Sequence, residues 1–209
     1  VLKYPEVEQV TLVDIDPEMT RLGSEFEPLR KLNRNALADP RVSIVNADAM
    51  IWLESQKNSF DVVVIDFPDP NSYSLGKLYT TRFYALLKSR LTPDSVVSIQ
   101  TTSPVVARRS YWCIVRTLEA AGFHVHPYHA SVPSFGDWGF SLASLAPVEP
   151  PDTLPTAVRG DVGYLTDDIL RSLFHLPLDM QPVEVDINRL DNQALVRYYE
   201  SESSFAPGS

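Results

Sequence analysis

Short, continuous runs of apolar residues alternate with amphipathic segments over residues 1–145. The runs have the length of strands, and they lack the alternation of apolar and polar positions that is typical of a half-exposed strand. Strands that are apolar throughout and are separated by helices indicate a parallel sheet with both faces covered. The predicted strands are 10–15, 41–47, 60–66, 95–102, 123–130 and 138–144, and the predicted helices are 17–32, 49–56, 80–91 and 104–121.

The last two predicted strands follow one another without a helix, which indicates an antiparallel hairpin at one edge of the sheet. After Leu145 the pattern changes. Residues 146–163 are rich in proline and read as a linker, and residues 164–209 contain two amphipathic helical segments and a short extended piece at 183–189. We therefore predict an α/β fold class and three parts: a domain at 1–145, a linker at 146–163 and a helical extension at 164–209.

Polar side chains with oxygen atoms follow four of the predicted strands. They are Asp14, Asp16, Asp48, Asp66, Asp69 and Gln100. Ligands of open parallel sheets bind beyond the carboxyl ends of the strands. Asp14 suits the two hydroxyls of a ribose, and Asp48 is placed to accept from an adenine amino group. The alternative for these acids is helix capping, which is the simplest explanation of Asp16.

Two of these acids, Asp66 and Asp69, stand in one proline-flanked turn directly after a very apolar strand. At such a position Asp66 is expected to be desolvated and to take up a proton readily. A plain turn in which Asp69 bonds the backbone ahead of Pro70 is the alternative. A metal site is not predicted, because no third hard ligand is nearby, and His124, His126 and His129 lack the further ligands of a zinc site.

The composition of the chain argues against several classes of function. The chain has 209 residues, of which 44% are hydrophobic, and a net charge of -9, which works against nucleic acid or an anionic membrane as partner. Its single cysteine, Cys113, excludes an internal disulfide and lies on a predicted buried helix face. No apolar run reaches the roughly 18 residues of a membrane span, and no signal pattern is visible at Val1, so the chain reads as soluble.

Six stretches in order, and above all the Asp-x-x-Asp-Pro turn with its aromatic-rich helix behind it, resemble the spermidine synthase (polyamine aminopropyltransferase) family. They are VLKYPEVEQVTLVDIDPEM, VSIVNADAMIWL, FDVVVIDFPDP, LYTTRFYALLKSRL, VVSIQTTSP and VPSFGDWGFSLAS. The tail, 164–200, resembles the long bacterial members, whose synthase domain follows a membrane-embedded segment. The resemblance implies a Rossmann-like, methyltransferase-type sheet.

The resemblance also implies an activity, the transfer of an aminopropyl group from decarboxylated S-adenosylmethionine to putrescine or a similar polyamine. By position, Asp66 would be the base, and Asp69 and Gln100 would contact the acceptor amine. Asp14 would bind the ribose of the donor, and Asp48 with Ala49 its adenine. No prosthetic group is expected. The expected partners are these small molecules and a second copy of the chain, which would form a homodimer. The expected location of the catalytic part is the cytoplasm, and an upstream segment of the parent chain would anchor it to the membrane.

The chain departs from the family pattern in two ways. Phe135 stands where the family has a tyrosine at the amine site. A hydroxyl contact to the amine is therefore lost, and the sequence does not predict which amine is the acceptor. The glycine-rich loop that the family has just before the stretch at Val1, and the strand that leads into it, are also missing from the sequence. Their absence would leave two apolar strand edges unpaired, which predicts either a fragment of a longer chain or a gap filled by a partner or a rearranged strand. Activity is then expected of the longer parent chain and not of the fragment alone. A methyltransferase that uses S-adenosylmethionine and a non-catalytic binding or assembly domain are the alternative functions.

Overall fold

A computed structural model describes residues 1–156, 158–160 and 162–203. The chain forms two compact units, Val1–Gln56 and Lys57–Ser209, called here the first and the second unit. Each unit is described by itself. Within the described residues, no helix combines the length and the apolar character that crossing a membrane requires.

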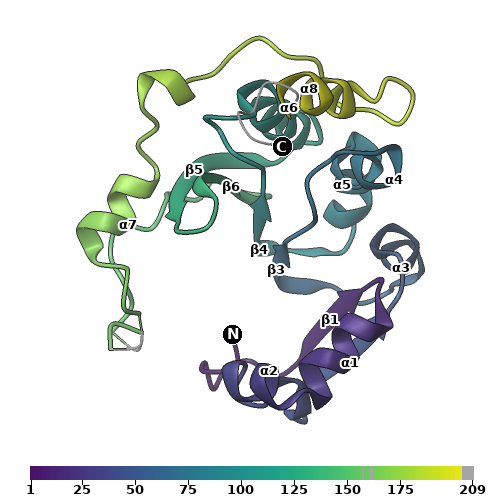
Figure 1. The fold of residues 1–209 in the computed structure, drawn as a ribbon, viewed down its shortest axis with the longest axis vertical. Coiled ribbons are helices and arrows are strands. Elements are labelled where there is room, and N and C mark those ends of the chain that lie inside the picture. The colour runs from purple at the N-terminus through teal and green to yellow at the C-terminus, as the bar shows by residue number, and fades with distance from the viewer. Residues whose placement is uncertain (157, 161, 204–209) are drawn as a thin grey trace. The chain divides into compact units, whose positions relative to one another are not determined.

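The first unit contains a pair of parallel strands with helices around it (Figure 1). Strands β1 (Val10–Asp14) and β2 (Val42–Asn46) pair in register from Val10 opposite Val42 to Asp14 opposite Asn46. The carboxyl ends of both strands therefore lie side by side. The helices are α1 (Pro17–Glu25), α2 (Glu27–Leu32), the 3-10 turn η1 (Ala36–Ala38) and α3 (Ala49–Ser55).

The single helix predicted over 17–32 is wrong, because the chain forms two helices that are separated at Phe26. The reason is Pro28, which has no N–H to donate to the carbonyl four residues earlier and whose ring would clash with it. Pro28 is instead tolerated in the first turn of α2, where an N–H would have no helical partner.

The second unit holds a four-stranded sheet in the order β3, β4, β6, β5. Its strands are β3 (Phe60–Ile65), β4 (Leu91–Gln100), β5 (His124–Val132) and β6 (Gly136–Ser144). Strands β3 and β4 are parallel, whereas β6 is antiparallel to both β4 and β5. The predicted antiparallel hairpin is therefore confirmed, and it joins the parallel pair through β6.

Two apolar strands pair on one side only in the described part of the chain, as predicted. Strand β1 pairs with β2 alone, and β3 pairs with β4 alone. The prediction that both sheet faces are covered is wrong at β3, where Val62 and Val64 are 70% and 66% exposed. The physical reason is that β3 lies at the edge of its sheet and, among the described residues, has β4 as its one neighbouring strand.

Helix α6 is the centre of the second unit's core. It spans Arg108–Ala120, and eight of its residues are buried. Tyr111, Trp112 and Val115 form a cluster against which Val183 and Val185 of the predicted extended piece pack. The other helical elements are α4 (Tyr73–Gly76), η2 (Lys77–Tyr79), α5 (Thr81–Lys88), α7 (Asp167–Leu173), η3 (Leu178–Met180) and α8 (Ala194–Ser203).

Asn188 fixes the C-terminal residues to this core. Its side-chain amide donates to the carbonyl oxygens of Gly76 and Tyr79, each at 3.1 Å, and its side-chain oxygen accepts from the Leu195 amide at 3.2 Å. Asn188 is fully buried. One side chain therefore joins the start of α8 to the segment that precedes α5.

Cys113 lies buried on α6, as predicted. Burial raises the pKa of its thiol to about 12. The thiolate is the reactive form, so the folded protein should hold an inert thiol. In an unfolded chain the thiol has a pKa of roughly 8.5, so above about pH 8 it ionises in the unfolded state while it stays neutral in the folded state. The contribution of Cys113 to the free energy of unfolding is therefore complete below about pH 8 and is lost as the pH rises toward 12.

We expect iodoacetamide to leave Cys113 unmodified in the native protein at about pH 8 and to modify it fully in denaturant, where the thiol regains its ordinary pKa. Mass spectrometry of the intact chain measures the labelled fraction. Stoichiometric labelling within minutes in the absence of denaturant would show that the thiol is accessible and that its burial is not as described.

Candidate acceptor and nucleoside sites

The three residues predicted to bind the donor nucleoside lie in the first unit, at the carboxyl ends of the parallel strands. Asp14 ends β1, Asp48 follows β2, and Ala49 is the first residue of α3. The amide of Ala47 donates to the carbonyl oxygen of Asp14 at 3.0 Å, which holds the two strand ends together. The structure therefore brings these predicted residues to one edge of the two-stranded sheet.

Capping accounts for part of these acids. The Asp16 carboxylate accepts from the Glu18 amide at 2.8 Å and caps α1, as the capping alternative predicted. Asp48 caps α3 by accepting from the Met50 and Ile51 amides. Asp14 does not cap a helix, and its Oδ1 accepts from the Asp16 amide at 2.8 Å. A nucleoside role for Asp48 would therefore be additional to its capping role.

Asp66 directly follows the last residue of β3, in the second unit. The expectation that it is desolvated is wrong, because Asp66 is exposed. The physical reason is that β3 is an edge strand whose Val62 and Val64 side chains are themselves open. In this structure water reaches Asp66, and closure of the site would have to come from a bound substrate or another segment.

Asp69 is held by two side-chain donors. Its Oδ1 accepts from the Gln100 amide at 3.2 Å, and its Oδ2 accepts from the Tyr199 hydroxyl at 2.7 Å. Gln100 ends β4, next to β3, and Tyr199 lies on α8, 130 residues away in the sequence. The predicted pair of Asp69 and Gln100 is therefore in direct contact, and each oxygen of the Asp69 carboxylate has its own donor.

Tyr79 lies beneath the turn. Its hydroxyl is 3.1 Å from the carbonyl oxygens of both Phe67 and Pro68 and 3.4 Å from Gln100 Oε1. Burial, and then the negative charges of Asp69 and Asp66, raise the pKa of Tyr79 well above its ordinary value. The hydroxyl therefore stays protonated and remains a donor to the turn that carries both acids.

The residues just after Gln100 have a fixed and unusual backbone. Thr102 has a φ of 62°, which is uncommon for a threonine, and its amide donates to Gln100 Oε1 at 3.3 Å. Gly139 exchanges backbone hydrogen bonds with this stretch, and a Cβ there would overlap the Thr102 carbonyl oxygen. Glycine at position 139 thus allows the close approach that fixes the Gln100 side chain.

Sequence reasoning did not single out Tyr79 or Tyr199. Tyr79 stands within the aromatic-rich stretch behind the acidic turn, so that stretch contained a usable signal. Tyr199 had none, because its contact with Asp69 depends on how α8 packs on α6. Phe135, which was expected near the amine site, is 65% exposed, and its ring lies 5.2 Å from the Trp138 ring.

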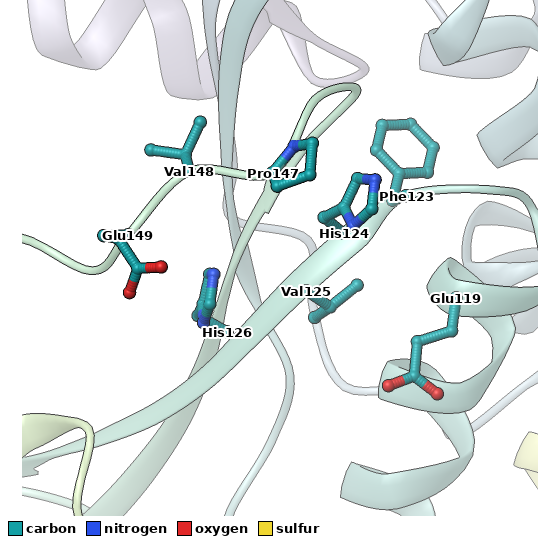
Figure 2. A pocket seen from close by; sticks show the side chains of 8 residues that line it. All are labelled: Glu119, Phe123, His124, Val125, His126, Pro147, Val148 and Glu149. Carbon is teal, nitrogen blue, oxygen red and sulfur yellow. The ribbon is translucent and has the colours of Figure 1, made fainter.

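A separate surface hollow lies at the start of β5 (Figure 2). It is lined in part by His124, His126, Glu119 and Glu149, and none of the predicted site residues is among its lining residues. Among the described residues, no group of three or more histidine, cysteine or acidic side chains is arranged to hold a metal ion. The hollow is therefore not part of the acceptor site.

Parallel strands with acids at their carboxyl ends and helices between them are typical of a Rossmann-like fold, and solved structures support this assignment. A spermidine synthase solved in complex with the transition state analogue AdoDATO matches with a TM-score of 0.72 and 26% identity, over 85% of this chain and 61% of that one. The spermidine synthase of Thermotoga maritima matches with a TM-score of 0.71 and 24% identity, over 85% and 60%.

The spermine/spermidine synthase domain family matches residues 1–149, and the chain belongs to this family. A polyamine aminopropyltransferase of Leptospira interrogans is 51% identical over 202 residues, and polyamine aminopropyltransferase 2 of Ralstonia nicotianae is 50% identical over 202. Both matches cover 97% of this chain, so they include most of the tail. The chain spans 40% and 39% of the length of these relatives.

Proposed function

We propose that this chain carries the acceptor site, and part of the donor site, of an enzyme that transfers an aminopropyl group from decarboxylated S-adenosylmethionine to a polyamine such as putrescine. The observation that carries the proposal is the oriented carboxylate of Asp69, which lies in one turn with Asp66 at the end of β3. The names of the curated relatives and membership of the family support it.

The reaction joins the amine nitrogen of the acceptor to the aminopropyl carbon that is attached to sulfur. The carbon–sulfur bond breaks, its electron pair returns to sulfur, and the positive sulfonium becomes a neutral thioether. An alkyl ammonium has a pKa near 10, so the acceptor must lose a proton before it can attack. Asp66 would take this proton, and Asp69 would hold the amine through a charge-assisted hydrogen bond. Gln100, which contacts Asp69, would complete the acceptor side.

On the donor side, we propose that Asp14 binds the ribose hydroxyls and that Asp48 with Ala49 contacts the adenine. The support is their position at the carboxyl ends of two paired parallel strands, where nucleotides bind in folds of this kind. A carboxylate can accept both ribose hydroxyls at once, which gives Asp14 the chemistry for this role.

The wider assignments remain part of the proposal. We propose that residues 1–145 form the catalytic domain, that 146–163 link it to the extension at 164–209, and that the protein acts as a homodimer without a prosthetic group. We further propose a cytoplasmic catalytic part with an upstream membrane anchor. The matches to the relatives cover 97% of this chain, and this supports the assignment of the extension to the same protein.

The test is to give the full-length protein putrescine with either decarboxylated or intact S-adenosylmethionine, and to measure product masses. We expect an aminopropyl adduct from the decarboxylated donor only, because Asp66 would repel the carboxylate of the intact one. A methylated product without an aminopropyl adduct would establish a methyltransferase. The absence of product from both donors would favour a non-catalytic binding domain.

A further inference from the structure

The last helix, α8, reaches the acceptor site. Its Tyr199 hydroxyl donates to Oδ2 of Asp69 at 2.7 Å, the shortest of the contacts described around this acid. Tyr199 lies beyond residues 1–149, the part that the family match covers. A side chain from the C-terminal extension therefore holds the acid that is proposed to bind the amine.

The position of Tyr199 is fixed by contacts on both sides of it along α8. Glu202 accepts from the backbone amides of Arg109 and Ser110 at 2.6 and 3.1 Å and from the Ser110 hydroxyl at 2.7 Å, so it caps α6. The Arg109 guanidinium lies 4.0 Å from the centre of the Tyr198 ring, within the range of a cation–π contact. Helix α8 is thus packed against α6, the central helix of the second unit.

The Tyr199 hydroxyl can act only as a donor to Asp69. Partial burial, and then the hydrogen bond to Asp69, raise the pKa of Tyr199 well above its ordinary value, so the phenol stays protonated at neutral pH. A carboxylate offers about four acceptor positions, and the tyrosine and Gln100 occupy one on each oxygen. The remaining positions keep a fixed direction for an incoming ammonium.

We propose that Tyr199 is a positioning residue of the acceptor site, which orients Asp69 for the polyamine and thereby makes amine binding depend on the C-terminal helix. This inference rests on the proposed aminopropyl transfer. It differs from a purely structural role for Tyr199, which would lower the amount of folded protein without changing the affinity for the amine.

The test compares Tyr199→Phe with Tyr198→Phe in the full-length protein. The neighbouring Tyr198 hydroxyl donates to Asp186 and not to the acceptor site, so it is a matched control. A hydrogen bond to a charged group corresponds to a change of roughly tenfold or more, so Tyr199→Phe should raise KM for putrescine by about tenfold. KM for the sulfonium donor should not change, and Tyr198→Phe should leave both values near those of the unmodified protein.

A double-mutant cycle with Asp69→Asn shows whether the effect passes through Asp69. If it does, Tyr199→Phe should change KM for putrescine little in the Asp69→Asn background, whereas additive effects would overturn the proposal. An unchanged KM for putrescine in Tyr199→Phe, with the unmodified protein active, would overturn it as well. Loss of product in the unmodified protein would instead count against the proposed function.

A second measurement does not depend on turnover or on removal of the hydroxyl. Replacing Tyr199 with 3-fluorotyrosine keeps the ring and the donor, so the fold should be retained. We expect its ¹⁹F resonance to shift on addition of putrescine and the shift to be absent after Asp69→Asn. A resonance that does not respond to putrescine at saturating concentration would overturn the proposal even where Tyr199→Phe fails to fold.

Discussion

Replacement of Asp66 by asparagine is expected to lower kcat/KM for aminopropyl transfer by roughly 10²- to 10⁴-fold, the usual contribution of a positioned general base. The asparagine amide has nearly the shape of the carboxylate, but it cannot accept the proton of the attacking ammonium. Asp66 directly follows β3 and is exposed, so its replacement should leave the free energy of unfolding nearly unchanged. The decrease in kcat/KM should therefore come from the missing proton acceptor and not from unfolding.

The matched control is Asp61→Asn, which makes the same change near the opposite end of the same strand. Asp61 accepts from the Thr92 hydroxyl at 3.2 Å, which an asparagine oxygen can also do. Initial rates with saturating donor and varied putrescine, together with thermal unfolding of each variant, separate the two effects. If Asp66→Asn and Asp61→Asn turned over alike, Asp66 would not be the base.

Replacement of Asn188 by alanine is expected to lower the free energy of unfolding by about 3 to 5 kcal/mol, because it leaves several buried polar groups without partners. The carbonyl oxygens of Gly76 and Tyr79 would lose a donor, and the Leu195 amide would lose its acceptor. Each such group costs roughly 1 to 3 kcal/mol, and the cavity adds to this cost. The start of α8 would detach from the segment before α5.

Urea unfolding followed by circular dichroism measures this change. The control is Asn58→Ala, since Asn58 is exposed in the loop before β3, and it should alter the unfolding midpoint little. If Asn188→Ala cost less than about 1 kcal/mol, the buried side-chain network would not be what attaches α8 to the core.

The strands and the hairpin were predictable because their signals are local. The apolar runs that end at Asp14 and Ile65 are strands, and the segments 123–130 and 138–144 form the antiparallel pair. The break at Phe26 was also written locally, in Pro28, but the amphipathic pattern continues across it. The exposure of the Val62 and Val64 side chains could not be predicted from the sequence alone, because exposure depends on which elements pack against β3 in the fold.

The acids of the candidate site were predictable from their positions at strand ends, and the contact of Asp69 with Gln100 follows from the pairing of β3 with β4. The exposure of Asp66 and the arrival of Tyr199 were not predictable, because both depend on tertiary packing. The motifs that carry the family resemblance lie within residues 1–145, and α8 lies outside this range.

The most direct test of the central claim, that the turn of Asp66 and Asp69 receives the amine, is a crystal structure of the full-length protein with putrescine and 5′-methylthioadenosine, the thioether that the reaction leaves. We expect one putrescine nitrogen within hydrogen-bonding distance of Asp69, next to the Tyr199 hydroxyl, and the attacking nitrogen within reach of Asp66. Putrescine bound elsewhere, with the Asp69 carboxylate contacting only Gln100 and Tyr199, would contradict the claim.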